Sequence, residues 1–530
     1  MKDVMKKYIY TVMIMCSLVM GGCNMVEVDE ESLPGDVFWY EGNAANVEAF
    51  TLSIYNYLRN ATMVKSAFFL ETGDLRCAPI VASDGNKNNS TYAPLWCLPD
   101  NDMSTLRSTC DKDNKGTSWN FGQIANWNLM YQVIATANIL QTNVDVVPNL
   151  SEAQVKSYKA EAIFMRNLTY FFLVRVFGDV PYFTDAFAYQ PLPRTPMVDV
   201  LKSCLAEMQA LLDSDPDAVA LPWTYNSYAK KCVRANRGAA LALMMHINMW
   251  LVRFDSNNKQ SYYENVKTLG YELIYQNGGA YELLDFNLLS SVFQGGSSEG
   301  LFEIAQSIGN NEVFDQNSIY ANYVNFTCFT DRSYSRFHYT ADFLSKIYPE
   351  YIESTDEGEY TRIENPDKRI KAWFDDYMYI SENSSLAREK EFKKLLNIDT
   401  YGESKITANS GNQIVFRLPD AILLYAEALA ALGENNAALN EVNKIRSRAG
   451  AVLLTSSGTL NDDIFWERTR ELMGEGHYYY DLVRTGKIHD MEYCNKAVTR
   501  MNFNQGAWTW PVSHKALENN AYMSLNLYWE

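Results

Sequence analysis

The feature that most constrains the fold is a long helical segment whose two ends are both marked in the sequence. Apolar side chains recur at helical spacing from about residue 151 to 176. Ser151, followed by Gln154, predicts a capping box at the start of this helix. Gly178 and Pro181 predict its end. A helix of this length must bury one face against neighbours, so the sequence predicts a body of packed helices.

Further stretches with helical spacing support this prediction. They lie at about 120–142, 197–212, 234–250, 261–275, 419–432, 435–448 and 462–473. Several are joined by short connections and predict helix–turn–helix pairs, and the Ala-rich stretch 421–438 permits close packing. The pattern resembles tetratricopeptide pairing, although the ~34-residue period is not visible as a strict repeat. We therefore expect a mostly α fold with a scaffold of helical hairpins.

Two regions, 50–119 and 280–415, lack this periodicity and predict loops with short strands. A G-x-S-x-G motif stands at 296–300. A nucleophile elbow needs a strand before the serine and a helix after it, whereas Leu301–Ile304 predicts a strand on the wrong side. The motif therefore predicts a flexible turn, and we expect no catalytic residues.

Metal and disulfide chemistry have little support in the sequence. Residues 111–116 resemble half of a calcium loop, but Lys115 replaces an oxygen ligand and Gly122 stands where a glutamate is needed. We expect no metal and no cofactor; a structural calcium ion lacks a full motif. Seven cysteines remain besides Cys16 and Cys23, with no C-x-x-C pair. A local disulfide among Cys77, Cys97 and Cys110, and unpaired thiols, are both open.

The N-terminal segment predicts a secretion signal followed by a membrane anchor. Lys2, Lys6 and Lys7 precede an apolar run over 8–20, which is too short to span a bilayer. Gly21-Gly22-Cys23 then resembles a bacterial lipoprotein signal, so residues 1–22 would be removed and Cys23 lipidated. A plain signal peptide or a transmembrane anchor are the alternatives. Residues 23–45 are expected to form a tether.

The acidic residues of the tether and the overall charge restrict location and partners. Glu27, Asp29, Glu30 and Glu31 resemble the surface-export signals of Bacteroidetes lipoproteins. We therefore expect a protein held in the outer membrane by lipid on Cys23 and facing the cell exterior. The net charge of −18 argues against a nucleic-acid partner, because a polyphosphate would be repelled.

A run of ordered motifs carries a family resemblance. Residues 160–182 (AEAIFMRNLTYFFLVRVFGDVPY) resemble the helix and "YGDVPY" turn of the SusD/RagB family, with Phe177 in place of the usual tyrosine. Residues 416–428, 438–450 and 467–487 resemble three later family motifs in the same order. From the residues themselves, Arg468, Arg470, Glu471 and Glu475 should pair between helices, and Glu427 needs an arginine partner if it is buried.

The resemblance implies one scaffold in three parts. Residues 46–285 would form an N-terminal helical region with ligand-facing loops at about 60–119, residues 286–415 a loop-rich variable region, and residues 416–530 a C-terminal helical region. It implies a non-enzymatic surface lipoprotein that captures oligosaccharides and delivers them to a SusC-like TonB-dependent transporter. The helical face would contact the transporter and the loops would meet the glycan.

Candidate ligand-binding residues lie in the irregular regions. By the resemblance, Trp96 would stack on a sugar ring, with Asp74 and Arg76 as polar partners. The full set is Asp74, Arg76, Tyr92, Trp96, Trp119, Tyr320, Tyr323 and Tyr334. Each aromatic ring could equally be a core or loop-anchoring residue. Two other functions stay open: a binder of a non-sugar nutrient such as peptides, and a surface glycoside hydrolase.

Overall fold

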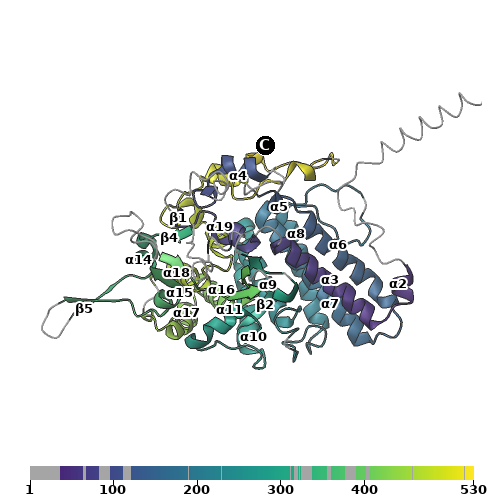
Figure 1. Ribbon diagram of the computed structural model, residues 1–530, viewed down its shortest axis with the longest axis horizontal. Helices are drawn as coiled ribbons and strands as arrows, with labels where there is room; N and C mark the ends of the chain where they lie inside the picture. Colours follow the sequence, from purple (N-terminus) through teal and green to yellow (C-terminus); the bar gives the residue numbers. More distant parts are fainter. Residues whose placement is uncertain are drawn as a thin grey trace, which may run out of the picture.

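The structure is a computed structural model (Figure 1). It describes residues 36–63, 67–82, 96–110, 121–188, 190–227, 229–310, 312–315, 320, 323, 337–354, 360–376, 390–401, 406–455, 458–518 and 520–530. Within these ranges no helix is both long enough and apolar enough to cross a bilayer.

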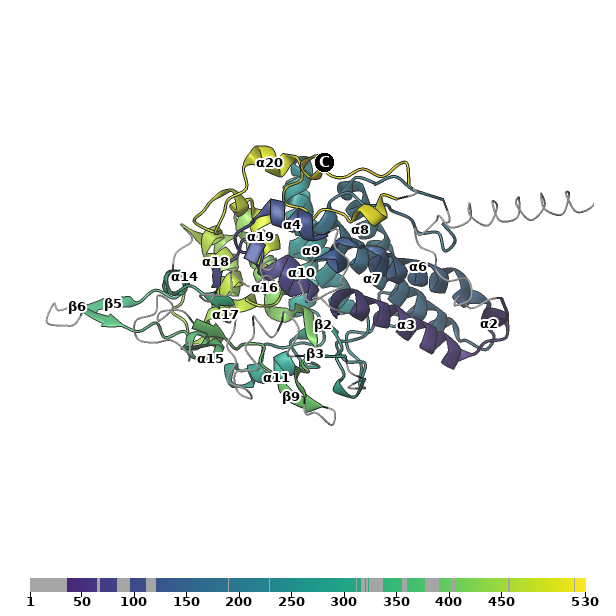
Figure 2. The same cartoon turned by 45° about the horizontal axis from the view of Figure 1, so that its top comes forward.

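Packed helices form most of the molecule, as the sequence predicts. Each of these helices contacts at least one other in the series, and Figures 1 and 2 show them running across the molecule. They are α3 (Ala44–Met63), α6 (Asn128–Asn143), α7 (Glu152–Phe177), α8 (Met197–Ser214), α9 (Arg237–Phe254), α10 (Lys259–Tyr275), α16 (Leu418–Ala431), α17 (Asn435–Ala449), α18 (Leu460–Leu472) and α19 (Tyr478–Thr485). The mostly α, hairpin-paired scaffold is confirmed.

The signals at both ends of α7 act as predicted. The Ser151 hydroxyl accepts a hydrogen bond from the Gln154 backbone N–H, and the Gln154 side chain accepts one from the Ser151 N–H. Gly178 ends the helix with φ +75°, a backbone conformation that residues with a side chain rarely adopt. Arg194 then fixes the exit by donating to the carbonyl oxygens of Phe177 and Asp179.

Three details of the predicted helices are wrong. Region 50–119 is not wholly irregular, because α3 occupies its start and α4 (Met103–Cys110) lies near its end. The stretch 120–142 is two helices, α5 (Gly122–Ala125) and α6, since Asn126 leaves the helical conformation. Helix α9 begins at Arg237 rather than 234, because the Asn236 side chain caps it by accepting from the Ala239 N–H. A short helix α2 (Asp36–Tyr40) lies within the segment expected to be a tether.

Short antiparallel strands fill the region between the helical blocks, as predicted. One sheet has the order β1-β4-β8-β7 and another the order β3-β10-β9, while β11 pairs with β2 and β5 with β6. Their bounds are β1 Ile80–Ala82, β2 Gly300–Ile304, β3 Phe314–Asp315, β4 Phe337–Tyr339, β5 Tyr351–Ser354, β6 Tyr360–Ile363, β7 Phe374–Asp376, β8 Lys390–Phe392, β9 Ile398–Tyr401, β10 Ile406–Asn409 and β11 Gln413–Arg417. The predicted strand after the G-x-S-x-G turn is therefore confirmed as part of β2.

A buried ionic network joins the strands to the C-terminal helices. Arg417 at the end of β11 contacts Glu299, Glu471 and Glu475, while Arg369 contacts Glu467 and Glu471. The predicted pairing between helices is confirmed for Arg468 and Glu471, whereas Arg470 pairs with Glu467 of its own helix and Glu475 pairs with Arg417 and Lys394. Glu427 also has its arginine, because both terminal nitrogens of Arg484 donate to its carboxylate. These charges are buried together, so each depends on its partners.

The described cysteines form no disulfide with one another, and all are buried. They are Cys77, Cys97, Cys110, Cys204, Cys232 and Cys494. The local disulfide left open among Cys77, Cys97 and Cys110 is not formed, and burial raises the pKa of the Cys77 thiol to about 12. A thiol with so high a pKa is inert at neutral pH.

Candidate functional site

Asp74 and Arg76 lie inside the molecule, where they hold chain segments together. Asp74 ends the π-helix η1 (Leu70–Asp74), and its Oδ2 accepts from the Gly476 N–H at 2.5 Å. Burial raises the pKa of Asp74 to about 8. Arg76 has no exposed surface and donates to the carbonyl oxygens of Ala507, Trp508 and Thr509. Both side chains are used for structure in this conformation.

Trp96 and Tyr323 are also in the core. The Trp96 ring packs against Phe337 with 4.6 Å between ring centroids, and 7% of the residue is exposed. The Tyr323 hydroxyl lies 2.6 Å from that of Tyr339. Cys23, Tyr92, Trp119 and Tyr334 lie outside the described residues, as does most of the calcium-like loop. The ligand-binding roles of all these residues stay predictions.

Tyr320 is the predicted residue that lines a surface depression with both amide and aromatic side chains in its wall. Its ring is half-buried and stacks on Phe314 of β3, with centroids 4.6 Å apart and planes 9° from parallel. The space inside it that a water molecule can occupy is about 40 Å³, and the empty space reaches about 520 Å³ when the open solvent at its mouth is included, so it is a shallow surface depression. Its walls are Ala67, Phe69, Leu70, Phe293, Gln306, Phe314, Tyr320, Leu395, Asn397, Asn409, Gly411, Asn412, Gln413, Ile414, Gly474 and Glu475. Below, this is called the Tyr320 depression.

Two asparagines set the shape of this depression. Asn409 donates to the Leu395 carbonyl and accepts from the Asn397 N–H, so it joins two loops. Asn412 likewise accepts from the Gln306 N–H. At Gly411 a Cβ atom would lie 2.3 Å from the Phe293 carbonyl oxygen, so only glycine fits. The backbone of this wall is therefore held firmly.

Other amides of the wall are held more loosely. Gln306 Nε2 lies 3.5 Å from the Asn409 carbonyl oxygen, and Gln413 Nε2 lies 3.5 Å from the Thr62 hydroxyl. Both distances are at the long limit for a hydrogen bond. A ligand hydroxyl can therefore replace either of these weak hydrogen bonds at a small cost in free energy. None of these amides was predicted. The run Asn409-Ser410-Gly411-Asn412-Gln413 was the available signal, since turn residues with several amides commonly form binding loops.

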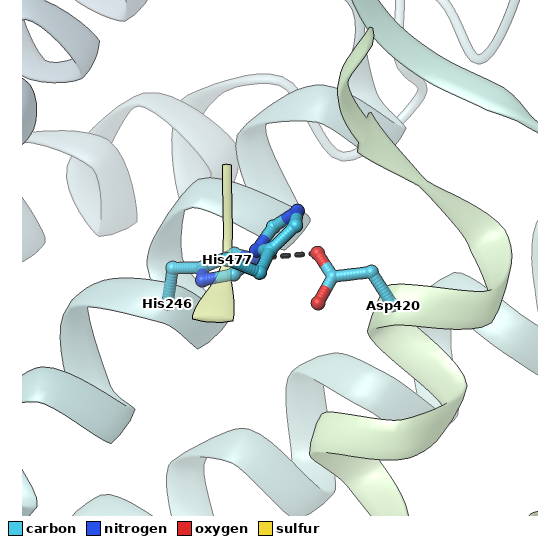
Figure 3. Close-up of side chains that lie close together, drawn as sticks. All are labelled: His246, Asp420 and His477. Carbon is cyan, nitrogen blue, oxygen red and sulfur yellow. Dashed lines mark hydrogen bonds and ion pairs between the residues drawn. The ribbon is translucent and has the colours of Figure 1, made fainter. Parts of the chain in front are cut away.

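A buried cluster of His246, Asp420 and His477 has the residue types of a metal site (Figure 3). The ligand atoms lie within 4.8 Å of one another, and His246 Nε2 is 2.6 Å from Asp420 Oδ2. Burial lowers the pKa of His477 to about 4 and lowers that of His246 as well. Both imidazoles are therefore neutral at pH 7, as zinc ligands must be.

The charges around this cluster do not fit a divalent cation. Arg468 donates to Asp420 Oδ1 at 2.8 Å, so the carboxylate already has a positive partner. Arg175 is buried nearby against Phe171 and Tyr480, and burial lowers its pKa to about 10. A divalent ion would add two positive charges to a site whose carboxylate is already neutralised, at a large desolvation cost. The cluster is therefore best explained as a structural hydrogen-bond network.

The fold and the Tyr320 depression together describe a helical-hairpin protein with an amide-lined and aromatic-lined depression on its surface. Comparison with known proteins places it more closely. A model described as "SusD family" matches residues 387–529, and one described as "Starch-binding associating with outer membrane" matches residues 76–249. A crystal structure of a SusD homolog from Bacteroides thetaiotaomicron VPI-5482 is 52% identical, with a TM-score of 0.83, and covers 93% of this chain and 100% of its own. The chain belongs to the SusD family.

Other relatives agree over the whole length. SusD-like protein P38 of Formosa agariphila is 25% identical over 98% of both chains. The structure of B. fragilis NanU has a TM-score of 0.69 at 19% identity, covering 94% of this chain and 99% of its own, and shows the shared fold.

Proposed function

We propose that this protein is a lipid-anchored glycan-binding protein of the cell surface. It captures oligosaccharides and delivers them to a SusC-like TonB-dependent transporter in the outer membrane. Membership of the SusD family supports the proposal, and one matching family model is described as starch-binding and associated with the outer membrane. In this proposal the helical face contacts the transporter, and lipid on Cys23 holds the protein at the membrane.

The observation that carries the binding role is the Tyr320 depression. Sugar rings present C–H faces that pack on aromatic rings, and the Tyr320–Phe314 stack lies at this wall. Sugar hydroxyls need hydrogen-bond partners of both kinds, and an amide has a donor and an acceptor. Aromatic rings with a few polar groups on a preformed wall are typical of small-ligand sites.

We propose binding without catalysis. Glycoside hydrolysis commonly uses a pair of carboxyl groups across the scissile bond. Among its described wall residues, the depression has one carboxylate, Glu475, and that group is held by Arg417 and Lys394. A carboxylate paired with two cations is a poor general acid. The proposal includes no resident metal and no cofactor.

Binding of the mature, acylated chain in detergent micelles tests this function. We expect retention on at least one polysaccharide in affinity electrophoresis, with no release of reducing ends after prolonged incubation. We also expect a TonB-dependent barrel to co-purify with it from its native membrane. Release of reducing sugars would favour the hydrolase alternative, and binding to a peptide array alone would favour the peptide-binding alternative.

A further inference from the structure

The walls of the Tyr320 depression contain almost no charge. Five amide side chains and several apolar and aromatic groups line it, and Glu475 is its single ionisable carboxylate among the described residues. An amide-lined wall can bind hydroxyl groups of either hydrogen-bonding sense but offers no counterion. The charge state of Glu475 therefore decides which ligands the site accepts.

Glu475 is ionised and fully neutralised by its neighbours. Its Oε2 accepts from Arg417 Nε at 2.6 Å, and its Oε1 accepts from Arg417 Nη2 at 2.7 Å. Lys394 also donates to Oε1. Burial opposes ionisation, but Arg417 and Lys394 hold the pKa of Glu475 below its usual value. The carboxylate has no charge left with which to attract a cationic ligand.

The two cations next to Glu475 are equally committed. Lys394 donates to the carbonyl oxygens of Glu471 and Met473 as well as to Glu475. Arg417 uses its remaining donors on Glu299 and Glu471. The side chains of Lys394 and Arg417 have no exposed surface, so neither can neutralise a carboxylate or sulfate on a ligand. Among the described wall residues, an anionic group placed in the depression would find no cationic partner to replace its lost hydration.

The electrostatic field of the whole protein also disfavours anionic ligands. The formal net charge is −18 from 46 basic and 64 acidic side chains. At low ionic strength this repels polyanions before contact, and salt of ~0.15 M screens the effect beyond about 8 Å. Close to the wall, the missing counterion is therefore the stronger determinant.

We infer that the Tyr320 depression selects neutral sugar units over uronic, sialic or sulfated ones. The inference rests on the proposed function and adds the chemical class of its ligand. Tyr320 supplies a ring face for the sugar, Gln306 and Gln413 turn to its hydroxyls, and the absence of a free cation among the described wall residues discriminates against acidic glycans.

A two-panel binding experiment tests this inference with the full mature chain. The neutral panel is soluble starch, galactomannan, arabinan and mixed-linkage β-glucan; the acidic panel is polygalacturonate, alginate and chondroitin sulfate, all in 0.15 M salt. We expect retardation by at least one neutral glycan and by no acidic one. Tyr320→Ala should weaken neutral binding roughly 10-fold or more, whereas Tyr320→Phe should retain most of it, because the ring face is kept.

Tyr271→Ala is the matched control. Tyr271 is a half-exposed tyrosine on α10 that is not part of the depression wall, so its removal should leave binding unchanged. Thermal melting of each variant identifies any that does not fold, and Gln306→Ala then serves as the second probe of the wall.

The possible outcomes separate the inference from the function. Acidic-glycan binding that Tyr320→Ala abolishes would overturn the inference and leave the binding function standing. Neutral binding that neither Tyr320→Ala nor Gln306→Ala reduces would also overturn it, by placing the sugar elsewhere. If no glycan of either panel binds, the proposed function fails and the inference fails with it.

Discussion

At the scale of single residues, burial decides what a side chain can do. Asp74 and Arg76 have the residue types of a sugar-binding pair, yet Asp74 accepts from the Gly476 backbone N–H and Arg76 donates to three backbone carbonyl oxygens. A local sequence pattern does not contain the distant partners, which for Arg76 are more than 400 residues away. Tyr320 is the opposite case, because it is only partly buried and lines the wall of a surface depression.

Asp74 should make stability depend on pH in an identifiable way. Burial raises its pKa in the folded protein to about 8, above the usual aspartate pKa of 3.8, so the folded state binds an extra proton between these values. Its contribution is complete below about pH 4 and is lost as the pH rises towards 8. The Asp74→Asn variant keeps an acceptor for the Gly476 N–H but does not ionise. We expect its melting temperature relative to wild type to rise steadily from pH 5 to pH 8.

The same comparison has a clear negative result. A melting-temperature difference between Asp74→Asn and wild type that is constant over this range would mean that Asp74 ionises normally in the folded protein. Circular dichroism at several pH values is sufficient for the measurement.

At the scale of elements, the sequence predicts helices with strong local signals and misses those without them. The cap of α7 and its Gly178 end were predictable because each signal lies within a few residues. Helix α3 was missed although Val47, Ile54 and Leu58 stand at helical spacing, because Thr51 and Thr62 are polar residues on the same buried face and weaken the apolar pattern. Strand pairs such as β1 with β4 join segments about 250 residues apart and leave no local pattern.

The capping box of α7 offers a quantitative test at this scale. Ser151→Ala removes the acceptor for the Gln154 N–H and should lower the free energy of unfolding by about 1 kcal/mol. Urea denaturation followed by circular dichroism measures it. Ser203→Ala is the control, because the Ser203 hydroxyl donates to the Asp199 carbonyl oxygen inside helix α8 and caps no helix end. Equal losses in the two variants would show that the box contributes nothing.

At the scale of the whole molecule, buried ion pairs join regions far apart in sequence. Glu467 on α18 has no exposed surface and contacts Arg369, Arg446 and Arg470. Burial opposes ionisation, but these arginines lower its pKa to about 2. The sequence predicted pairing between helices for Arg468, Arg470, Glu471 and Glu475. It could not predict Arg369 as a partner, because that residue comes from the loop-rich region. Neither this network nor the amide wall of the candidate site could be found by local pattern alone.

Removing the charge of Glu467 should be severe. Glu467→Gln leaves three arginines facing a neutral group, and we expect a loss of about 3–5 kcal/mol in unfolding free energy at pH 7. Because the folded pKa is below that of the unfolded chain, the wild-type advantage exists above about pH 4.5 and fades as the pH falls towards 2. The difference between the variants should therefore narrow in acid, as followed by urea unfolding.

The exposed pair of Lys371 and Glu364 provides the control for Glu467. More than two thirds of each side chain is exposed. Glu364→Gln should therefore change stability by less than about 1 kcal/mol. A loss of similar size in Glu467→Gln would contradict the role given to the buried network.

The proposed lipid anchor gives the last prediction at the scale of the whole molecule. Cys23→Ser removes the thiol that acylation requires and leaves the described fold untouched. We expect the variant to move from the membrane fraction to the soluble fraction after cell lysis, and to lose incorporation of radiolabelled palmitate. Retention in the membrane without label would mean that something other than acyl chains holds the protein there.

The bonds from Arg76 to residues 507–509 have a consequence for how the protein is made. The Arg76 guanidinium cannot form these hydrogen bonds until the ribosome has added the acceptor carbonyls, which lie 431 to 433 residues later in the chain. At ~5–20 residues per second of ribosomal synthesis, that delay is roughly 20–90 s. During this time the first third of the nascent polypeptide lacks the residues that close it. We expect it to stay open, which is the state that a translocation pore can thread.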